Sequence, residues 1–226
     1  MYTLHYAPDN ASLIIRLVLE EARLPYTTAL VDRSIRAQDS PAYLRLNPTG
    51  LIPALETPHG PMFETGAILL WLSDTHGLGP TPDAPDRGDF LKWLFFISNT
   101  LHAEMRQLFY ADRFAPPGAE AGHHALLTGR LTQHLAVLDH AATQSPALFT
   151  APSLLTIYLA TLLRWAALYP EGKVNWFRLA DYPALAVLAK AMDARPATLT
   201  CAVAEGLGPT PFSNPSYATP PEGSAT

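Results

Sequence analysis

The stretch from Asn47 to Glu56, NPTGLIPALE, and the nearby pair Glu64-Thr65 have the residue types of a peptide-binding site. Pro53 stands directly before an apolar strand-like segment, where a proline removes no hydrogen bond of the sheet. If the Ile52-Pro53 bond is cis, the Ile52 backbone points sideways and can pair with an extended peptide, as an added strand does. A helix starting after Glu64 offers N–H groups and the Thr65 hydroxyl to a carboxylate, while Glu64 attracts an ammonium. The stretch predicts a site for an extended zwitterionic peptide.

The first part of the chain alternates short strands and helices that would position this site. Strand-forming residues, turn residues and proline stops predict the order βαβαββα. The expected strands are 2–6, 26–31, 54–57 and 62–63, and the expected helices are 12–22 (capped by Asn10 or Ser12), 41–46 (capped by Ser40) and one that begins near 67 and ends by 77. A helical crossover between the first two strands implies that they are parallel. We therefore expect a small four-stranded mixed sheet with helices on its faces, the thioredoxin-like α/β arrangement, over residues 1–78.

The remainder of the chain is predicted to be helical. Residues 79–85 contain three prolines and a glycine close to one another, which is typical of a linker. An all-α helical bundle is expected over 86–208, with helices at 86–113, 121–144, 153–168, 182–195 and 197–205. The segment 209–226 is rich in Pro, Ser, Thr and Gly, so we expect it to be disordered or held only by contacts to its own surface.

Composition excludes several classes of protein. A net charge of −5 with scattered basic residues argues against a nucleic-acid partner. The single cysteine, Cys201, rules out a disulfide framework, and the sequence shows neither a signal peptide nor a membrane-spanning run. Four histidines, at 123, 124, 134 and 140, lack the spacing of a metal site. We expect a cytoplasmic protein without a metal and without a membrane association.

The residues of the predicted peptide site resemble the glutathione site of the glutathione S-transferase family. Further segments resemble the bacterial beta-class members of that family: Leu24-Pro25-Tyr26, Arg164-Trp165, Tyr182-Pro183-Ala184-Leu185, Arg195-Pro196 and Ala204-Glu205-Gly206-Leu207. The resemblance covers about residues 2–208 and implies a bacterial homodimer that binds glutathione, a zwitterionic peptide. The glutathione contacts that it implies are Ile52, Pro53, Glu64, Thr65 and Arg36 in the first part, and Asn99 and His102 in the second.

The chemistry implied by the resemblance is activation of the glutathione thiol, because the thiolate is the nucleophile. A hydrogen-bond donor at the turn from Ala7 to Ser12 would lower the pKa of that thiol. Asn10 offers an amide donor, Ser12 offers a hydroxyl, and Tyr6 lies at the end of the preceding strand. Ala11 stands where beta-class members carry a cysteine, which argues against a mixed disulfide between protein and glutathione.

Two further features follow from the resemblance. Arg106, Tyr110 and Arg113 are expected to shape a pocket for the acceptor, beyond His102 on the first long helix. Ser153 and Thr156 stand where the family usually has a capping box that ends in Asp, and we expect Thr156 to form it as well.

Three functions remain open from the sequence. The first is a detoxifying transferase that conjugates the glutathione thiolate to small apolar electrophiles. The second is a glutathione-dependent disulfide reductase or peroxidase, because an amide donor occurs at the thiol in reductase-like members. The third is a non-catalytic binding or scaffold protein that keeps the fold and the glutathione pocket.

Overall fold

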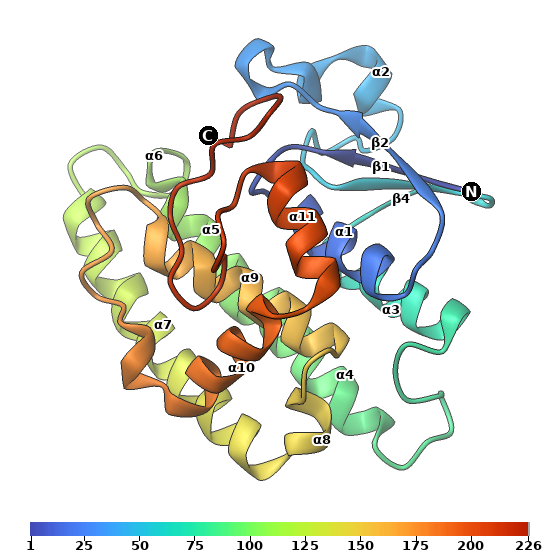
Figure 1. Ribbon diagram of the computed structural model, residues 1–226. Coiled ribbons are helices and arrows are strands. Elements are labelled where there is room, and N and C mark those ends of the chain that lie inside the picture. The colour runs from blue at the N-terminus through green and yellow to red at the C-terminus, as the bar shows by residue number, and fades with distance from the viewer. Residues whose placement is uncertain (226) are drawn as a thin grey trace. The chain divides into compact units, whose positions relative to one another are not determined.

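A computed structural model of the chain describes residues 1–225 and divides it into two compact units (Figure 1). Unit 1 consists of Met1–Arg87, Asp193–Pro211 and the described residues from Ser216 onward, and unit 2 consists of Gly88–Met192 and Phe212–Pro215. The sequence predicts that residues 193–208 belong to the helical bundle expected over 86–208. The contacts of this segment instead place it in the unit that contains the sheet.

Unit 1 is built on the expected mixed sheet. The strands are β1 (Tyr2–Tyr6), β2 (Tyr26–Leu30), β3 (Ala54–Thr57) and β4 (Gly60–Phe63). Within residues 1–225 they form one four-stranded sheet in the order β2-β1-β3-β4. The β1–β2 pair is parallel, and the β1–β3 and β3–β4 pairs are antiparallel. The thioredoxin-like topology is therefore confirmed.

Within residues 1–225, unit 1 also contains four α-helices: α1 (Ser12–Glu21), α2 (Pro41–Leu44), α3 (Thr65–His76) and α11 (Pro196–Glu205). Two short 3-10 helices, Arg33–Ile35 and Ala37–Asp39, follow β2. Every residue of α1 from Ser12 to Leu19 is buried, because the helix packs against β1, α3 and α11. Figure 1 shows α11 (orange-red) beside α1 (blue). Ser40 caps α2 as expected, since its hydroxyl accepts a hydrogen bond from the Tyr43 N–H. The helix at Glu64-Thr65 starts two residues earlier than the sequence indicated.

The predicted cap of α1 is wrong. Its N-cap residue is Ala11, which makes no side-chain cap bond, and Ser12 is already the first helical residue. The Ser12 hydroxyl turns back to the preceding turn, where it bonds to the backbone of Ala7. Buried backbone groups in a turn need hydrogen-bond partners. The Ser12 hydroxyl supplies them for Ala7 and therefore does not cap the helix.

Unit 2 is helical, as the sequence predicted. Its elements are α4 (Arg87–Phe95), a π-helix (Phe96–His102), α5 (Ala103–Phe109), α6 (Ala111–Phe114), α7 (Glu120–Gln144), α8 (Pro146–Phe149), α9 (Leu154–Leu168), a 3-10 turn (Leu179–Asp181) and α10 (Pro183–Asp193). The helix expected over 86–113 is therefore interrupted by a π-helical segment and ends in a separate short helix. The capping box of Ser153 and Thr156 is confirmed at the start of α9.

The segment after α11 is irregular but packed, so the expectation of disorder is wrong for its described part. The Thr219 N–H donates to the Gly206 carbonyl (2.8 Å), and Arg33 Nη1 donates to the Ala225 carbonyl (2.7 Å). Figure 1 shows this segment (dark red) returning from α11 toward β2. Its proline-rich composition excludes helix and strand but does not prevent it from packing against unit 1.

None of the helices in the described part of the chain has both the length and the apolar character needed to cross a membrane.

Candidate glutathione site

The strand register of unit 1 brings the predicted site segments to one end of the sheet. His5 pairs with Ala54, and Ala54 pairs with Phe63. The turn after β1, the loop before β3 and the residues after β4 therefore meet at this end. Since β2 is parallel to β1, the segment after Leu30 reaches the same end. Residues 7–12, 52–53, 64–65 and 33–36 are gathered there by topology alone.

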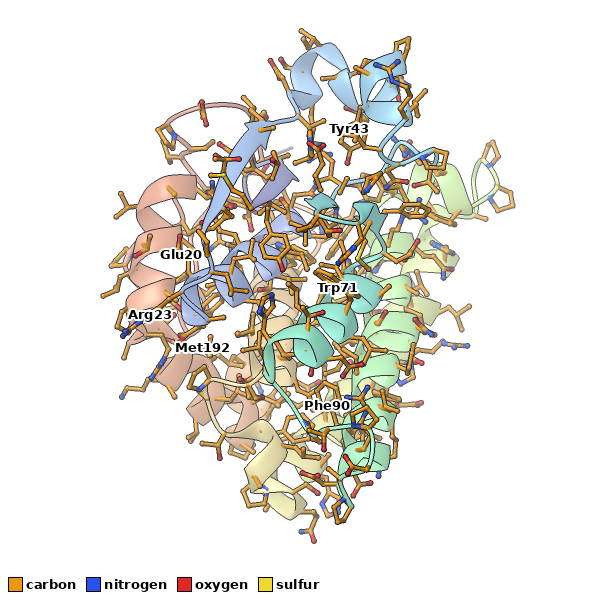
Figure 2. The ribbon with its side chains drawn as sticks, turned by 90° about the vertical axis from the view of Figure 1, so that its right-hand side faces the viewer. Glu20, Arg23, Tyr43, Trp71, Phe90 and Met192 are labelled. Atoms are coloured by element: carbon orange, nitrogen blue, oxygen red, sulfur yellow. The ribbon has the colours of Figure 1, made fainter. Side chains whose placement is uncertain are left out.

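Buried side chains fix the loop that precedes β3. The Tyr43 hydroxyl donates to the Leu51 carbonyl (2.6 Å), and Asn47 Nδ2 donates to the same oxygen (2.7 Å). Asn47 Oδ1 accepts from the N–H and the hydroxyl of Thr49. Tyr43, a residue of α2 that is labelled in Figure 2, is 4% exposed, and its burial raises the pKa of its hydroxyl above the usual range. Two side-chain donors thus hold the Leu51 carbonyl, directly before Ile52.

Ile52 and Pro53 occupy the position expected of a backbone recognition edge. The Ile52-Pro53 bond is cis. Gly50 has a φ of 65°, and this left-handed conformation lets the loop turn tightly before Leu51. Pro53 is buried, whereas Ile52 is half-buried.

Glu64 has an unusual backbone conformation at the start of α3. Its φ is 70° and its ψ is 109°, a region that non-glycine residues rarely adopt. Its side chain makes no capping bond and is exposed, whereas the adjacent Thr65 is buried. Such conformations cost about 1–3 kcal/mol and concentrate at functional sites. The free N–H groups of the first turn of α3 lie directly after it, and these groups attract anions.

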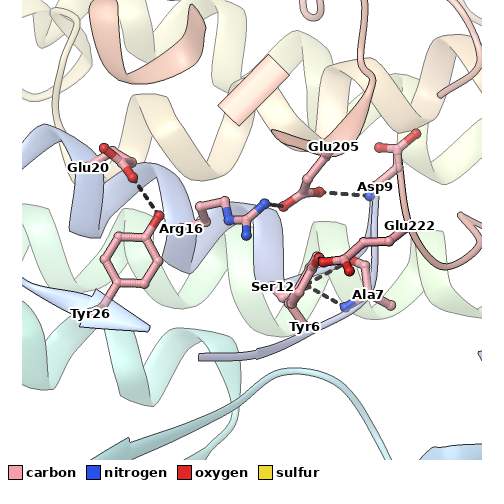
Figure 3. Close-up of polar contacts among 9 residues, drawn as sticks. All are labelled: Tyr6, Ala7, Asp9, Ser12, Arg16, Glu20, Tyr26, Glu205 and Glu222. Atoms are coloured by element: carbon pink, nitrogen blue, oxygen red, sulfur yellow. Dashed lines mark hydrogen bonds and ion pairs between the residues drawn. The ribbon is translucent and has the colours of Figure 1, made fainter. Parts of the chain in front are cut away.

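The three side chains proposed for the thiol differ in their hydrogen bonds, and Figure 3 shows two of them, Ser12 and Tyr6. The fully buried Ser12 hydroxyl donates to the Ala7 carbonyl (3.0 Å) and lies 3.3 Å from the Ala7 nitrogen, which donates to it. Asn10 is partly exposed, and its Oδ1 accepts from the Ala11 N–H (2.8 Å). Within residues 1–225, no hydrogen bond uses Asn10 Nδ2 as its donor.

Tyr6 contacts two charged side chains outside the turn, Glu222 and Arg16. Its hydroxyl donates to the Glu222 carboxylate, and its ring lies under the Arg16 guanidinium at 4.4 Å. Burial and the hydrogen bond to Glu222 raise the pKa of Tyr6 to about 12. The hydroxyl is therefore protonated at neutral pH and donates to the C-terminal segment.

Arg36 lies at the sheet end, but its side chain is largely exposed. Its φ is 55°, and its Nε donates to Asp39 Oδ2 (2.6 Å). Arg33, three residues earlier in the chain, donates to the Ala225 carbonyl. The assignment of Arg36 to a ligand carboxylate stays a prediction.

In unit 2, the π-helix carries both residues that were assigned to glutathione, Asn99 and His102. His102 Nδ1 lies 2.8 Å from the Tyr158 hydroxyl, and the ring packs against Trp165. Burial, with a smaller contribution from the Arg106 charge, lowers the pKa of His102 to about 4. His102 is therefore neutral at neutral pH. π-helical segments occur frequently at functional sites.

The other unit 2 residues of the predicted site lie on α5, α6 and their junction. Asn99, on the π-helix before them, is exposed and accepts from the Ser98 hydroxyl (3.0 Å). Arg106 lies over the Phe114 ring (5.3 Å), and Arg113 lies over the Tyr110 ring (5.0 Å). These stacked guanidinium groups are held in place by aromatic rings. An acceptor pocket formed by Arg106, Tyr110 and Arg113 stays a prediction.

Sequence reasoning missed two groups of residues in unit 1. Tyr43 received no role in the sequence analysis, although its hydrogen bond to the Leu51 carbonyl fixes the loop that precedes β3. Arg16 and Glu205 form a buried ion pair that also holds the Asp9 backbone. An arginine inside the apolar run of α1 was the available signal, because a buried charge needs a partner.

Over the described residues, no group of three or more His, Cys, Asp or Glu side chains is arranged to hold a metal ion.

Comparisons with known proteins match both the first part of the chain and most of its length. The family profile described as "Glutathione S-transferase, N-terminal domain" matches residues 11–75. Glutathione S-transferase GST-4.5 of Xanthomonas campestris is 29% identical over 168 residues, which is 72% of this chain and 81% of that protein. Disulfide-bond oxidoreductase YfcG of Escherichia coli is 35% identical over 124 residues, which is 51% of this chain and 57% of that protein.

A solved structure supports the same relationship at the level of the fold. A sphingomonad glutathione S-transferase complexed with glutathione has 29% sequence identity and a TM-score of 0.73, covering 91% of this chain and 100% of that chain. The matched profile contains the α1, β3 and Glu64-Thr65 segments of the site described above. The sheet topology, the arrangement of the site and these similarities lead to one conclusion: in sequence and in fold the chain is similar to glutathione S-transferases over most of its length, and residues 11–75 match the N-terminal domain of that family.

Proposed function

We propose that the chain is a glutathione transferase that binds glutathione at the common end of β1, β3 and β4. The observation that carries the proposal is the convergence of Ile52, Glu64 and the Ala7–Ser12 turn at this end through the strand register. The Ile52 backbone pairs with the backbone of the tripeptide. The first turn of α3 and Thr65 bind one carboxylate, and Glu64 binds the ammonium. The sphingomonad relative, whose structure contains glutathione, supports this ligand.

The reaction proposed is conjugation to a small apolar electrophile. Bound glutathione loses its thiol proton to solvent, and the Asn10 amide group stabilises the thiolate by donating a hydrogen bond. The sulfur then attacks the electrophilic carbon, so a C–S bond forms and the leaving group departs with its electron pair. Asn10 is favoured because it is partly exposed, whereas the Ser12 hydroxyl bonds to Ala7 and the Tyr6 hydroxyl bonds to Glu222.

A second candidate function is reduction of disulfides with glutathione. The similarity to the Escherichia coli protein named disulfide-bond oxidoreductase favours it. In this reaction the thiolate attacks a mixed disulfide of glutathione, so oxidised glutathione forms and the substrate thiolate departs. The same binding site and the same donor would serve both reactions.

Calorimetry of the purified protein with reduced glutathione tests the binding site. We expect saturable binding that Glu64→Gln weakens about tenfold or more, because the substitution removes a charge-assisted hydrogen bond. Glu20→Gln is the matched control, since Glu20 accepts a hydrogen bond from Tyr26 at the start of β2, which is the opposite end of the sheet. Failure to bind millimolar glutathione, or equal weakening by both variants, would refute the site.

Turnover assays separate the two reactions. The protein with glutathione is assayed against an aryl halide and against a small mixed disulfide of glutathione. Conjugation of the aryl halide supports the transferase, and disulfide turnover without conjugation assigns the second function. Binding without either reaction would leave a non-catalytic role.

A further inference from the structure

The last residue of α11, Glu205, is buried beside the turn that leads into α1. Its side chain has no exposed surface, and its two carboxylate oxygens bond to different parts of unit 1. Oε1 accepts from Arg16 Nη1 on α1 (3.1 Å), and Oε2 accepts from the Asp9 N–H in the turn (2.9 Å). Figure 3 shows Glu205 between these two donors. One carboxylate thus fixes the turn relative to the helix that follows it.

The bonded turn residue has a conformation that needs such support. Asp9 has a φ of 48°, which places a non-glycine residue in the left-handed region. The conformation of Asp9 determines where the next residue, Asn10, presents its amide group. The Asp9 N–H has Glu205 as its partner in a buried environment, so the bond persists without competition from water.

We propose that Glu205 is a positioning residue for the thiol-binding turn: through Arg16 and the Asp9 N–H it holds Asn10 in the orientation that donates to the sulfur of bound glutathione. This inference rests on the proposed function, because it requires that glutathione binds beside the turn. It assigns Glu205 no contact with glutathione. Its effect is on the ionisation of the bound thiol and not on recognition of the peptide backbone.

A purely structural ion pair is a weaker explanation of this arrangement. Buried ion pairs contribute little net stability compared with apolar residues of similar size. Within the described residues, Arg16 Nε has no hydrogen-bond partner, so the pair is not optimised for satisfying the guanidinium. The charged or titratable groups that interact electrostatically with Glu205 are Arg16 and Asp9, together with Tyr6 at the end of β1 and Cys201 on α11. Burial raises the pKa of Glu205 to about 7, while both the Arg16 charge and the Asp9 N–H oppose that shift.

Glu205→Gln tests the proposal, because an amide has one acceptor atom and cannot serve both donors. The pKa of the bound thiol is measured by ultraviolet titration of the thiolate, with S-methylglutathione as the blank. We expect this pKa to rise by about one unit, which corresponds to about tenfold less thiolate below the pKa. The calorimetric affinity for glutathione at a pH where the thiol is protonated should be unchanged, and kcat should fall while KM for glutathione stays the same.

Glu21→Gln is the matched control. Glu21 pairs with Arg195 through two hydrogen bonds of 2.9 Å at the other end of α1, so its loss also weakens the α1–α11 contact. We expect this variant to lose stability without a change in the pKa of the bound thiol. Glu205→Asp provides a second test if the glutamine variant does not fold. Its shorter side chain keeps the charge for Arg16 but does not reach the Asp9 N–H, so the thiol pKa should again rise.

The outcomes distinguish this inference from the proposed function. If the unmodified protein does not bind glutathione, the proposed function fails, and this inference fails with it. If glutathione binds and the Glu205 variants leave the thiol pKa unchanged, only the positioning role is refuted. An equal rise in the Glu21→Gln control would also refute it, because the effect would then reflect general loosening of α1.

Discussion

Glu64 combines an unfavourable backbone conformation with an exposed carboxylate at the start of α3. Its φ of 70° is unfavourable for any residue with a Cβ, and its exposed side chain makes no capping bond that would offset this cost. The strain therefore has no structural benefit for α3. The backbone conformation and the free carboxylate are explained together if the residue is selected to hold a ligand ammonium.

Replacement of Glu64 by glycine should separate the two effects. We expect Glu64→Gly to raise the free energy of unfolding by about 1 kcal/mol, because glycine adopts positive φ without a steric cost. The same variant should bind glutathione more weakly, since the carboxylate is lost. Denaturant unfolding and calorimetry measure the two quantities. A destabilised variant would show that the conformation is not strained.

At the scale of elements, the sequence predicted those features that depend on neighbouring residues. The capping box at Ser153 and Thr156 and the start of β3 after Pro53 are local patterns, and both are present. The interruption of the helix around Asn99 was not predictable, because π-helical hydrogen bonding leaves no composition signal in an otherwise helical segment. The bond from Asp9 to Glu205 spans 196 residues, so no local pattern could reveal it.

The C-terminal segment was misjudged for a related reason. Its composition lacks apolar residues in a regular pattern, yet backbone packing against α11 does not require side chains. Gly206 is the clearest case, since a Cβ there would lie 1.9 Å from the Thr219 carbonyl oxygen. A glycine at this position permits the chain to pass directly over the end of the helix.

Two glycines at helix ends allow a matched test of this contact. Gly206 and Gly77 have nearly the same φ, 65° and 64°, but a Cβ on Gly77 would meet nothing within 4 Å. We expect Gly77→Ala to cost about 1 kcal/mol, which is the penalty for the left-handed conformation alone. Gly206→Ala should lower the free energy of unfolding by clearly more than Gly77→Ala, because its Cβ would also collide with Thr219. It should also expose residues 209–225 to limited proteolysis. Equal costs for the two variants, measured by denaturant unfolding, would contradict the packing of this segment.

At the scale of the whole molecule, unit 1 is assembled from both ends of the chain. The sheet and α1 come from the first part, whereas α11 comes from residues 196–205. The contact between α1 and α11 contains buried apolar residues such as Ala197 and Cys201, and the Arg195–Glu21 and Arg16–Glu205 pairs lie on either side. The N-terminal part is therefore not an independent structural unit, even though its secondary structure is complete without α11.

Truncation at two positions tests this dependence. A chain that ends at residue 194 keeps residues 1–87 and 88–192 but lacks α11, and a chain that ends at residue 208 retains α11 as the matched control. In the shorter chain we expect faster hydrogen exchange in β1 and α1, because α1 loses its packing contact with α11, and weaker glutathione binding. Exchange in α7 and α9, which pack within unit 2, should stay slow in both chains. If α1 keeps its protection without α11, the N-terminal part folds on its own, and the dependence of unit 1 on α11 is refuted.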